Sequence, residues 1–342
     1  MNKKPQYNIA MVGATGTVGE TLLSILEERG FPVAELVPLA SDRSAGSKLT
    51  FRGKQVAVRD LAGYDFSGID VAFFSAGAAV SRQHVPRAVE AGAVVIDNTS
   101  EFRDADDVPL VVSEVNPHAI AEYPHRNIIA NPNCSTMQML VALAPIHRAA
   151  RIERINVATY QSVSGAGRSG IEELGRQTAD LLNFREVEPS KFPAQIAFNV
   201  IPQGGDFMEN GYTTEEMKLV RETRKILEDD AILVNPTVVR VPVFFGHSEA
   251  VHIETRDRID AATARALLEA APGVVVVDER KAGGYPTPVG HAAGKDAVFV
   301  GRIREDISHP NGLDLWVVSD NIRKGAALNA VQVAEILIRE YL

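Results

Sequence analysis

Residues 8–30 read NIAMVGATGTVGETLLSILEERG. The aliphatic run Ile9–Val12 predicts a buried strand, and Thr17–Arg29 predicts a helix that stops at Gly30. Between them lie three glycines with the spacing G-x-x-G-x-x-G: Gly13, Gly16 and Gly19. Glycines let the backbone turn tightly and approach a pyrophosphate, and a helix N-terminus adds N–H donors. The triplet alone could be only a turn, but its place between a first strand and a first helix favours a dinucleotide site.

The alternation of strand and helix continues to about residue 130. Short aliphatic runs predict further strands at Val33–Ala40, Asp70–Ser75, Val94–Asp97 and Asn127–Ala130. The intervening Ala79–Ala91 reads as a helix stopped by Gly92. Near-continuous aliphatic strands separated by helices predict a parallel sheet that is covered on both faces.

The pattern changes after residue 150. Long alternating strands are expected at Ile152–Val163, Val238–Thr255, Ala297–Arg304 and Leu313–Asp320, with amphipathic helices at Ser169–Leu182, Glu215–Leu227 and Ala261–Ala271. This is α+β character with a broad sheet, which often forms a dimer face. A final amphipathic helix, Ala326–Tyr341, is expected to return to the first domain.

The predicted architecture is therefore α/β with two domains. The first is a Rossmann-type parallel-sheet domain, residues 1–131 and 322–342, completed by the C-terminal helix. The second is an α+β catalytic and dimerisation domain, residues 132–321. A length of 342 residues is enough for two hydrophobic cores.

Composition limits the class of protein. The net charge is −9 without a basic stripe, which argues against a nucleic-acid surface. A single cysteine excludes an intrachain disulfide and fits a reducing compartment. The first residues lack a secretory apolar core, and the apolar runs are too short to span a membrane. We expect a cytoplasmic enzyme without a membrane partner.

The single cysteine, Cys134, lies in the run NPNCST at residues 131–136. A strand is predicted before it and an apolar-periodic helix after it, with Ser135 and Thr136 as helix starters. The thiol is therefore expected at a helix N-terminus, where the macrodipole favours thiolate over thiol. Most free cysteines are small buried hydrophobes, but these polar neighbours are unusual for a core position. From this segment alone, a displayed nucleophile and a buried structural cysteine are equally open.

Cofactor preference is read at the end of the second strand, where residues 41–46 are SDRSAG. An acidic residue there binds the ribose 2′-hydroxyl of NAD, whereas arginine with serine binds the 2′-phosphate of NADP. Arg43 between two serines, including Ser44, favours NADP. Asp42 leaves NAD open as the alternative.

A nicotinamide domain combined with one displayed cysteine implies oxidation of an aldehyde through a thioester. His247 is the favoured base, because it follows an apolar strand and a glycine turn and is expected to titrate near neutral pH. Arg240, seven positions earlier on the same strand-like segment, suits a carboxylate or a phosphate. Gln161, before the glycine-rich residues 164–167, could orient the acyl group. The alternatives are an ordinary surface or core histidine and an ordinary strand glutamine.

Two further features suit charged ligands. Arg103 follows a parallel strand's carboxyl end, where α/β sheets bind ligands. Glu215 and Lys218 lie three positions apart on one helix face. The alternative for this pair is a solvated salt bridge of little energetic value.

Together these residues resemble the aspartate-β-semialdehyde dehydrogenase family, specifically its bacterial branch. The similarity runs essentially end to end, through Gly13–Gly19, Ser41–Gly46, Ser75–Gly77, Ser100–Arg103, Asn131–Thr136, Gln161–Gly167, Arg240–Glu249 and Ser319–Ala327. It implies reversible reductive dephosphorylation of L-4-aspartyl phosphate to L-aspartate 4-semialdehyde with NADPH. This reaction leads toward lysine, threonine, methionine and isoleucine.

The resemblance also implies a role for each matching residue. Cys134 would be the acyl-thioester nucleophile, His247 the acid/base and Gln161 the group that positions the acyl carbon. Arg240 would hold the substrate α-carboxylate and Glu215 its amino group. The implied phosphate ligands are Arg103, Asn133 and Lys218. The implied NADP(H) ligands are Gly13, Thr15, Gly16, Thr17, Val18, Arg43, Ser44, Ser164, Gly165 and Asn321. No metal is implied, and the family forms homodimers or dimers of dimers.

Two kinds of rival stay open. One is another phosphorylating reductase, such as N-acetyl-γ-glutamyl phosphate reductase or glyceraldehyde-phosphate dehydrogenase. Glu215 argues against these, because an acetylated amine carries no charge and a sugar phosphate has no amine. The other rival is a non-catalytic NADP-binding regulator, which would need neither Cys134 nor His247.

Overall fold

The computed structural model describes residues 4–342. The chain forms two compact units. One comprises the chain up to Pro132 together with Ala326–Leu342, and the other comprises Asn133–Gly325. Each unit is built around a six-stranded sheet. Within residues 4–342, no helix has both the length and the apolar character to cross a bilayer.

The sheet of the first unit is entirely parallel, in the order β5-β2-β1-β6-β7-β8. Its strands are β1 (Tyr7–Val12), β2 (Val33–Ala40), β5 (Arg59–Asp60), β6 (Val71–Phe74), β7 (Val94–Asp97) and β8 (Ile128–Ala130). The strand order reverses between β1 and β6, which creates the switch point where such sheets bind ligands. The predicted parallel, Rossmann-type sheet is confirmed.

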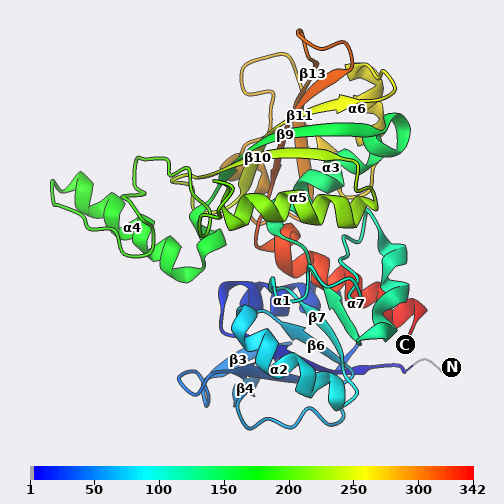
Figure 1. Ribbon diagram of the computed structural model, residues 1–342. Helices are drawn as coiled ribbons and strands as arrows, with labels where there is room; N and C mark the ends of the chain where they lie inside the picture. Colours follow the sequence, from blue (N-terminus) through cyan, green and yellow to red (C-terminus); the bar gives the residue numbers. More distant parts are fainter. Residues whose placement is uncertain (1–3) are drawn as a thin grey trace. The chain divides into compact units, whose positions relative to one another are not determined.

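Helices cover this sheet, as the near-continuous aliphatic strands require. They are α1 (Thr17–Glu28), α2 (Ala78–Glu90), the 3₁₀ segment η1 (Pro117–His125) and α7 (Asn329–Glu340). The C-terminal helix α7, red in Figure 1, packs beside α1, and its apolar face joins the core that surrounds β1. The expectation that the C-terminal helix completes this domain is confirmed. A small hairpin, β3 (Lys48–Phe51) and β4 (Lys54–Ala57), follows β2.

The sheet of the second unit is mixed, in the order β10-β9-β11-β14-β13-β12. Its strands are β9 (Ile152–Gln161), β10 (Leu233–Arg240), β11 (His247–Thr255), β12 (Val274–Val276), β13 (Val298–Glu305) and β14 (Gly312–Ser319). Central pairs are antiparallel, and the two outer pairs are parallel. The expected broad α+β sheet is therefore present.

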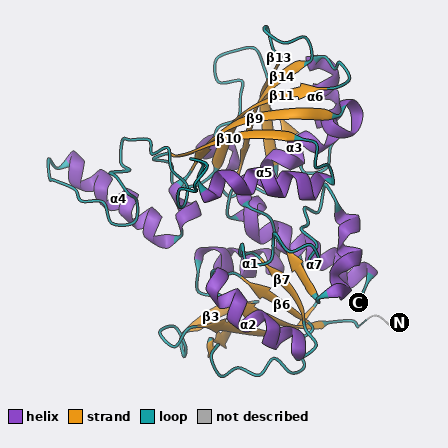
Figure 2. Ribbon diagram, in the orientation of Figure 1, coloured by secondary structure: helices purple, strands orange, loops and turns teal. Residues whose placement is uncertain are grey.

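One face of this sheet is covered by α3 (Cys134–Ala150), with α5 (Thr214–Leu227) against β10 and α6 (Ala261–Glu269) against β12 (Figure 2). The short segment η2 (Val163–Ala166) follows β9, and η3 (Pro288–Ala292) precedes β13. Another short segment, η4 (Arg323–Leu328), leads into α7. Helix α4 (Arg168–Leu182) projects from the sheet and has its own small apolar core. Twelve of the 17 residues of α3 are buried, because the helix packs on the sheet with α5 and α6 as neighbours.

Two strand predictions were wrong, one in its middle and one at its end. Val238–Thr255 is not one strand: β10 ends at Arg240, and β11 begins at His247. Pro242 has no N–H to give to a ladder, and Gly246 has φ +89°, so the chain turns between the strands. The strand expected at Ile152–Val163 ends at Gln161, because the chain enters η2. The short strands β3, β4, β5 and β12 were not predicted.

Candidate active site

Cys134 is the first residue of α3, so the predicted placement of the thiol at a helix N-terminus is confirmed. The expected helix starters were wrong, since Asn133 is the N-cap. Its Oδ1 accepts hydrogen bonds from the N–H groups of Ser135 at 3.0 Å and Thr136 at 3.3 Å. Cys134 is partly exposed. The helix dipole therefore acts on Cys134 while the cap occupies the neighbouring amides.

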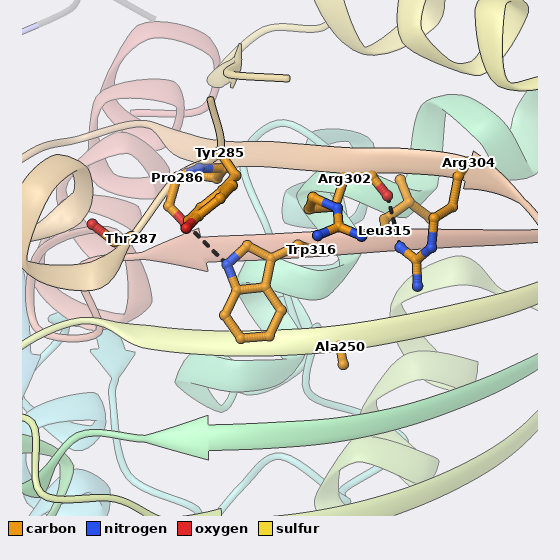
Figure 3. A pocket seen from close by; sticks show the side chains of 8 residues that line it. All are labelled: Ala250, Tyr285, Pro286, Thr287, Arg302, Arg304, Leu315 and Trp316. Atoms are coloured by element: carbon orange, nitrogen blue, oxygen red, sulfur yellow. Dashed lines mark hydrogen bonds between the residues drawn. The ribbon is translucent and has the colours of Figure 1, made fainter. Parts of the chain in front are cut away.

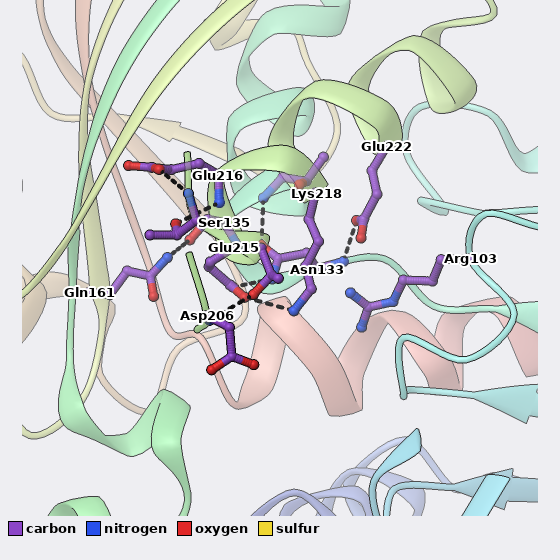
Figure 4. A network of polar contacts seen from close by, with 12 residues as sticks. Arg103, Asn133, Ser135, Gln161, Asp206, Glu215, Glu216, Lys218 and Glu222 are labelled. Carbon is purple, nitrogen blue, oxygen red and sulfur yellow. Dashed lines mark hydrogen bonds and ion pairs between the residues drawn. The ribbon is translucent and has the colours of Figure 1, made fainter. Parts of the chain in front are cut away.

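Gln161 ends β9 beside this helix start. Its side chain is buried, and its Nε2 donates to Ser135 Oγ at 3.0 Å (Figure 4). The side-chain amide of Gln161 is thus held by Ser135, the residue that follows Cys134. Gly325 approaches from another segment, and a Cβ added there would lie 2.7 Å from Cys134 Cβ. Only a glycine fits against the cysteine at this approach.

His247 begins β11 and is completely buried. Its Nδ1 accepts a hydrogen bond from the N–H of Ser162 at 3.0 Å and lies 3.1 Å from Ser162 Oγ. Burial lowers the pKa of His247 well below its usual range, and the positive charge of Arg240 lowers it further. The expectation that this histidine titrates near neutral pH was therefore wrong.

Arg240 ends β10 and does not share a strand with His247, contrary to the sequence-based expectation. Its Nη1 donates to the carbonyl of Ser162 at 2.7 Å. A Cβ on Gly165 would lie 3.0 Å from Arg240 Nη1 and 3.2 Å from His247 Nε2. The guanidinium and the imidazole therefore converge beside Gly165. Burial lowers the pKa of Arg240, and the charges of Glu215 and Cys134 oppose that shift.

Glu215 and Lys218 form the predicted pair on α5, with 2.7 Å between Glu215 Oε2 and Lys218 Nζ. Asn133 Nδ2 also donates to Glu215 Oε1, which connects this pair to the start of α3 (Figure 4). The Glu215 side chain is 16 % exposed, so the pair is not the solvated surface bridge of the alternative interpretation. Glu222 Oε2 accepts from the Asn133 N–H at 2.6 Å and holds the other side of the cap.

In the first unit, the glycine loop lies at the switch point of the sheet. Gly13 has φ +87°, and a Cβ there would lie 2.7 Å from the Ser75 carbonyl oxygen. A Cβ on Gly19 would lie 2.3 Å from the Gly13 carbonyl oxygen, so α1 can pack closely on the loop only through glycine. Gly16 is the N-cap of α1 and supplies no side-chain cap.

A cavity of about 640 Å³ opens beside this loop. Its walls include Gly13, Thr15 and Gly16 from the loop, and Ser41–Ser44 after β2. Arg43 and Ser44 therefore line the same cavity as the glycines, and so does Asp42. The wall also contains His84 and Asp60, which sequence reasoning missed.

Arg103 is buried in the first unit, where its Nη2 donates to the Asn98 carbonyl at 2.8 Å. Nearby Asp97 is also buried, and burial raises its pKa although Thr99 and Ser81 donate hydrogen bonds to it. Arg103 thus belongs to one unit, whereas Asn133 and Lys218, the other predicted phosphate ligands, belong to the second.

Comparison with known proteins agrees with these features. A family model described as semialdehyde dehydrogenase, NAD binding domain, matches residues 8–123. A second, described as semialdehyde dehydrogenase, dimerisation domain, matches residues 143–324. The aspartate-semialdehyde dehydrogenase of Legionella pneumophila is 61% identical over 98% of this chain and 96% of its own length. The chain belongs to the aspartate-semialdehyde dehydrogenase family.

Solved structures extend the comparison. Aspartate semialdehyde dehydrogenase II of Vibrio cholerae, complexed with ASA, has a TM-score of 0.97 at 59% identity, covering 99% of this chain and 100% of that one. The Candida albicans enzyme with NADP has a TM-score of 0.75 at 26% identity, covering 97% and 98%. Membership of the aspartate-semialdehyde dehydrogenase family makes the protein an oxidoreductase that acts on an aldehyde group, with a nicotinamide-dinucleotide-binding domain.

Sequence reasoning missed several buried polar residues of this aspartate-semialdehyde dehydrogenase family member. Ser162 contacts both Arg240 and His247. Glu249 lies two residues beyond His247 on β11, on the same face, and Gln138 of α3 lies beside it. The period of a strand could have pointed to Glu249, but nothing in the sequence marks Ser162. Among residues 4–342, no group of three His, Cys, Asp or Glu side chains is arranged to hold a metal.

Proposed function

We propose that the protein catalyses the reversible, NADP-dependent conversion of L-4-aspartyl phosphate to L-aspartate 4-semialdehyde and phosphate. Cys134 is the nucleophile and forms an acyl thioester. The observation that carries this proposal is the single thiol on the first turn of α3, beside buried Arg240 and Gln161. The helix dipole and the guanidinium both stabilise a thiolate there.

The charges of the second unit suit an amino-acid substrate. Arg240 binds the α-carboxylate, because a buried guanidinium favours a carboxylate partner. Glu215 binds the α-ammonium group, which then competes with Lys218 for the same carboxylate. Lys218 and Asn133, with Arg103 from the first unit, bind the phosphate. Two anionic groups and one cation on the substrate thus meet groups of opposite charge.

Gln161 positions the acyl group, because its amide is already fixed beside Ser135. His247 acts on the substrate oxygen as the acid/base of the reaction. The thiolate attacks the aldehyde carbon, or the acyl carbon of the phosphate, and the carbon–oxygen π electrons move to oxygen. In the direction that forms L-4-aspartyl phosphate, inorganic phosphate attacks the thioester carbon. The C–S bond breaks, and Cys134 leaves as a thiolate.

The cavity of the first unit suits the adenosine end of NADP. The proposed NADP(H) ligands are Gly13, Thr15, Gly16, Thr17, Val18, Arg43 and Ser44, with Ser164, Gly165 and Asn321 from the second unit. Arg43 and Ser44 favour NADP by binding the 2′-phosphate, and the NADP complex of the Candida relative supports this choice. When bound, the nicotinamide accepts or donates hydride.

A homodimer is proposed, or a dimer of dimers, through the sheet face opposite α3. Tyr160 is 38% exposed on that face, and its ring lies 5.5 Å from that of Trp316. Trp316 forms part of a pocket with Tyr285, Ala250 and Leu315 (Figure 3). An aromatic patch of this kind is typical of an interface, and the matching family model is described as a dimerisation domain. The proposed setting is the cytoplasm, in the biosynthesis of lysine, threonine, methionine and isoleucine.

The deciding experiment is a steady-state assay of NADP⁺ reduction by L-aspartate 4-semialdehyde with and without inorganic phosphate. We expect reduction that requires phosphate, with little activity toward N-acetylglutamate semialdehyde. Preference for the acetylated compound would indicate the reductase of that substrate instead. Absence of turnover with intact NADP⁺ binding would indicate a non-catalytic regulator.

A further inference from the structure

The cavity beside the glycine loop has polar groups that the cofactor assignments above leave unused. Its wall includes Asp60, the last residue of β5, and His84 of α2. Val80 and His84 lie four positions apart on one face of α2, and both line the cavity. Strand β5 pairs with β2 through Ala40, so Asp60 lies beside the strand end that leads to Arg43. Two elements of the first unit thus bring a carboxylate and an imidazole to one cavity.

Arg87 fixes the imidazole of His84 from the next turn of α2. Its Nη1 lies 2.8 Å from His84 Nδ1. The same guanidinium donates to the carbonyl of Ala62 at 3.1 Å and to that of Tyr64 at 2.8 Å, which holds it in place. A guanidinium has N–H donors and no acceptor, so Nδ1 must supply the lone pair of this contact. In the neutral imidazole, the proton is therefore on Nε2.

The imidazole of His84 is an uncharged donor. Burial lowers the pKa of His84 and the charge of Arg87 lowers it further, whereas the charge of Asp60 opposes the shift. Nδ1 is occupied by Arg87, and Nε2 has no hydrogen-bond partner within residues 4–342. His84 therefore offers a ligand one N–H group and no positive charge, which distinguishes it from Arg43 on the same cavity wall.

Asp60 offers the complementary acceptor. Its Oδ1 accepts from the N–H of Ala62 at 3.2 Å, which orients the carboxylate at the end of β5. Its Oδ2 has no hydrogen-bond partner in the described part of the chain. Asp60 and His84 are close enough for their charges to interact. The cavity therefore presents a neutral N–H donor and a carboxylate acceptor near one another.

The 2′-phosphate indicates which part of NADP faces this pair. Arg43 and Ser44 line the same cavity, and the proposed function assigns the 2′-phosphate to them. That phosphate belongs to the adenosine ribose, so the base that enters the cavity is adenine and not nicotinamide. Adenine carries an amino group, N6, that donates beside a ring nitrogen that accepts. A carboxylate and a neutral N–H group complement this pattern, whereas Asp60 would repel a phosphate.

We propose that Asp60 and His84 recognise the adenine base of NADP(H). The Asp60 carboxylate accepts from the N6 amino group, and His84 Nε2–H donates to a neighbouring ring nitrogen. The inference rests on the proposed function and adds selection of the base to selection of the 2′-phosphate. A base with a carbonyl oxygen at position 6 is disfavoured, because it places an acceptor against the carboxylate.

The first test compares NADP⁺ with nicotinamide hypoxanthine dinucleotide phosphate, in which a carbonyl oxygen replaces the N6 amino group, by calorimetry on the wild-type protein. We expect the hypoxanthine cofactor to bind about 10- to 100-fold more weakly. In Asp60→Asn, Oδ1 still accepts from Ala62 while Nδ2 donates to the carbonyl oxygen, so the difference should fall below about three-fold or reverse. Equal affinities in the wild type, or an undiminished difference in Asp60→Asn, would overturn the proposal. The wild-type comparison is decisive by itself should the variant not fold.

The second test compares His84→Leu, which removes the donor, with His84→Gln, whose side-chain amide accepts from Arg87 and still has an N–H group for the base. Since both cofactors carry adenine, His84→Leu should weaken NADP⁺ and NAD⁺ alike, by about 5- to 20-fold, whereas His84→Gln should stay within about three-fold of the wild type. A loss confined to NADP⁺, no loss at all, or an equal loss in both variants would overturn the proposal.

Neither test needs turnover, so the inference and the proposed function can fail separately. Failure of the semialdehyde assay with NADP⁺ still bound would refute the proposed reaction and leave recognition of adenine intact. Absence of NADP⁺ binding would overturn both. Equal binding of the adenine and hypoxanthine cofactors, with normal turnover, would overturn only the roles of Asp60 and His84.

Discussion

Helices α1 and α3 each follow a strand of the parallel sheet after a short loop: α1 follows β1, and α3 follows β8. Their first turns differ. Helix α1 starts after Gly16, whose missing side chain leaves the first amides without a side-chain cap. Helix α3 starts after Asn133, whose Oδ1 takes the N–H groups of Ser135 and Thr136. An uncapped glycine start offers its donors to an external anion. A capped start uses them internally and leaves the field of the helix for Cys134, its own first residue.

The surroundings of the two helix starts differ in the same way. The loop before α1 opens onto a cavity of about 640 Å³, whose wall includes Arg43. The start of α3 lies among buried hydrogen bonds that involve Gln161, Glu215 and Glu222. One region has room for a large ligand, whereas the other fixes the small set of groups to which the proposed reaction assigns the chemistry. Binding and chemistry should therefore be separable by substitution.

The sharpest test of that separation is Cys134→Ala. Loss of the nucleophile should lower turnover by more than about 10⁴-fold, since no neighbouring thiol can replace it. The dissociation constant for NADP⁺, measured by calorimetry, should stay within a few-fold of the wild type. Residual turnover above one-hundredth of the wild-type rate would contradict the thioester route. A large loss of NADP⁺ affinity would show that the two regions are not independent.

The next largest effect is expected from His247→Gln. This change should lower kcat by roughly 10²–10⁴, the range for losing an acid, a base or an oxyanion donor. NADP⁺ binding should be unaffected, as with Cys134→Ala. The matched control is His309→Gln, because His309 lies in the loop before β14, away from Cys134 in the sequence and the sheet. An unchanged rate in His247→Gln would remove this histidine from the mechanism.

The cavity beside the glycine loop of α1 is tested by Arg43→Ala. Loss of one charge-assisted contact to the 2′-phosphate should weaken NADP⁺ binding by about 10- to 100-fold. NAD⁺ lacks that phosphate, so its affinity should change by less than about two-fold and provides the internal control. The companion change Asp42→Ala should weaken NAD⁺ more than NADP⁺ if Asp42 binds the ribose 2′-hydroxyl. Equal losses of both cofactors in Arg43→Ala would mean that Arg43 does not select between them.

The sequence was informative where function depends on local pattern. The spacing of Gly13, Gly16 and Gly19 predicted the loop, because strand, turn and helix are encoded within one short segment. The same holds for the helix start at Cys134 and for strands such as β2 and β7. The turn between Arg240 and His247 was also marked, by Pro242 and Gly246, but the apolar pattern across it was read as one continuous strand.

What the sequence could not predict depends on contacts between distant segments. Ser162 and His247 are 85 positions apart, and only the pairing of β9 with β11 brings them together. The lowered pKa of His247 follows from burial and from Arg240 on a third strand, neither of which can be read from the residue itself. The cap formed by Asn133 was misassigned because Ser135 and Thr136 are equally good caps by type.

The smallest expected effect concerns the stability of the fold. It tests whether burial of the Glu249 carboxyl makes the free energy of unfolding depend on pH. Glu249 is completely buried, and burial raises its pKa well above the usual range, although the neighbouring Gln138 amide partly opposes the shift. The unfolded chain loses this proton near pH 4.5, whereas the folded protein retains it to higher pH. Wild-type stability should therefore fall as pH rises from about 4.5 toward the folded pKa, by about 1.4 kcal/mol per pH unit.

Glu249→Gln keeps the shape and removes the ionisable group, so it should abolish this loss. The variant should match the wild type in Tm near pH 4.5 and exceed it by a few degrees near pH 8, since about 1 kcal/mol shifts Tm by roughly 1–2 °C in a chain of 342 residues. The exposed Glu209→Gln serves as the control and should leave the pH dependence of Tm unchanged. A Tm difference that does not grow with pH would mean that Glu249 ionises in the folded protein, with a cation or water inside the layer between α3 and the sheet to stabilise it.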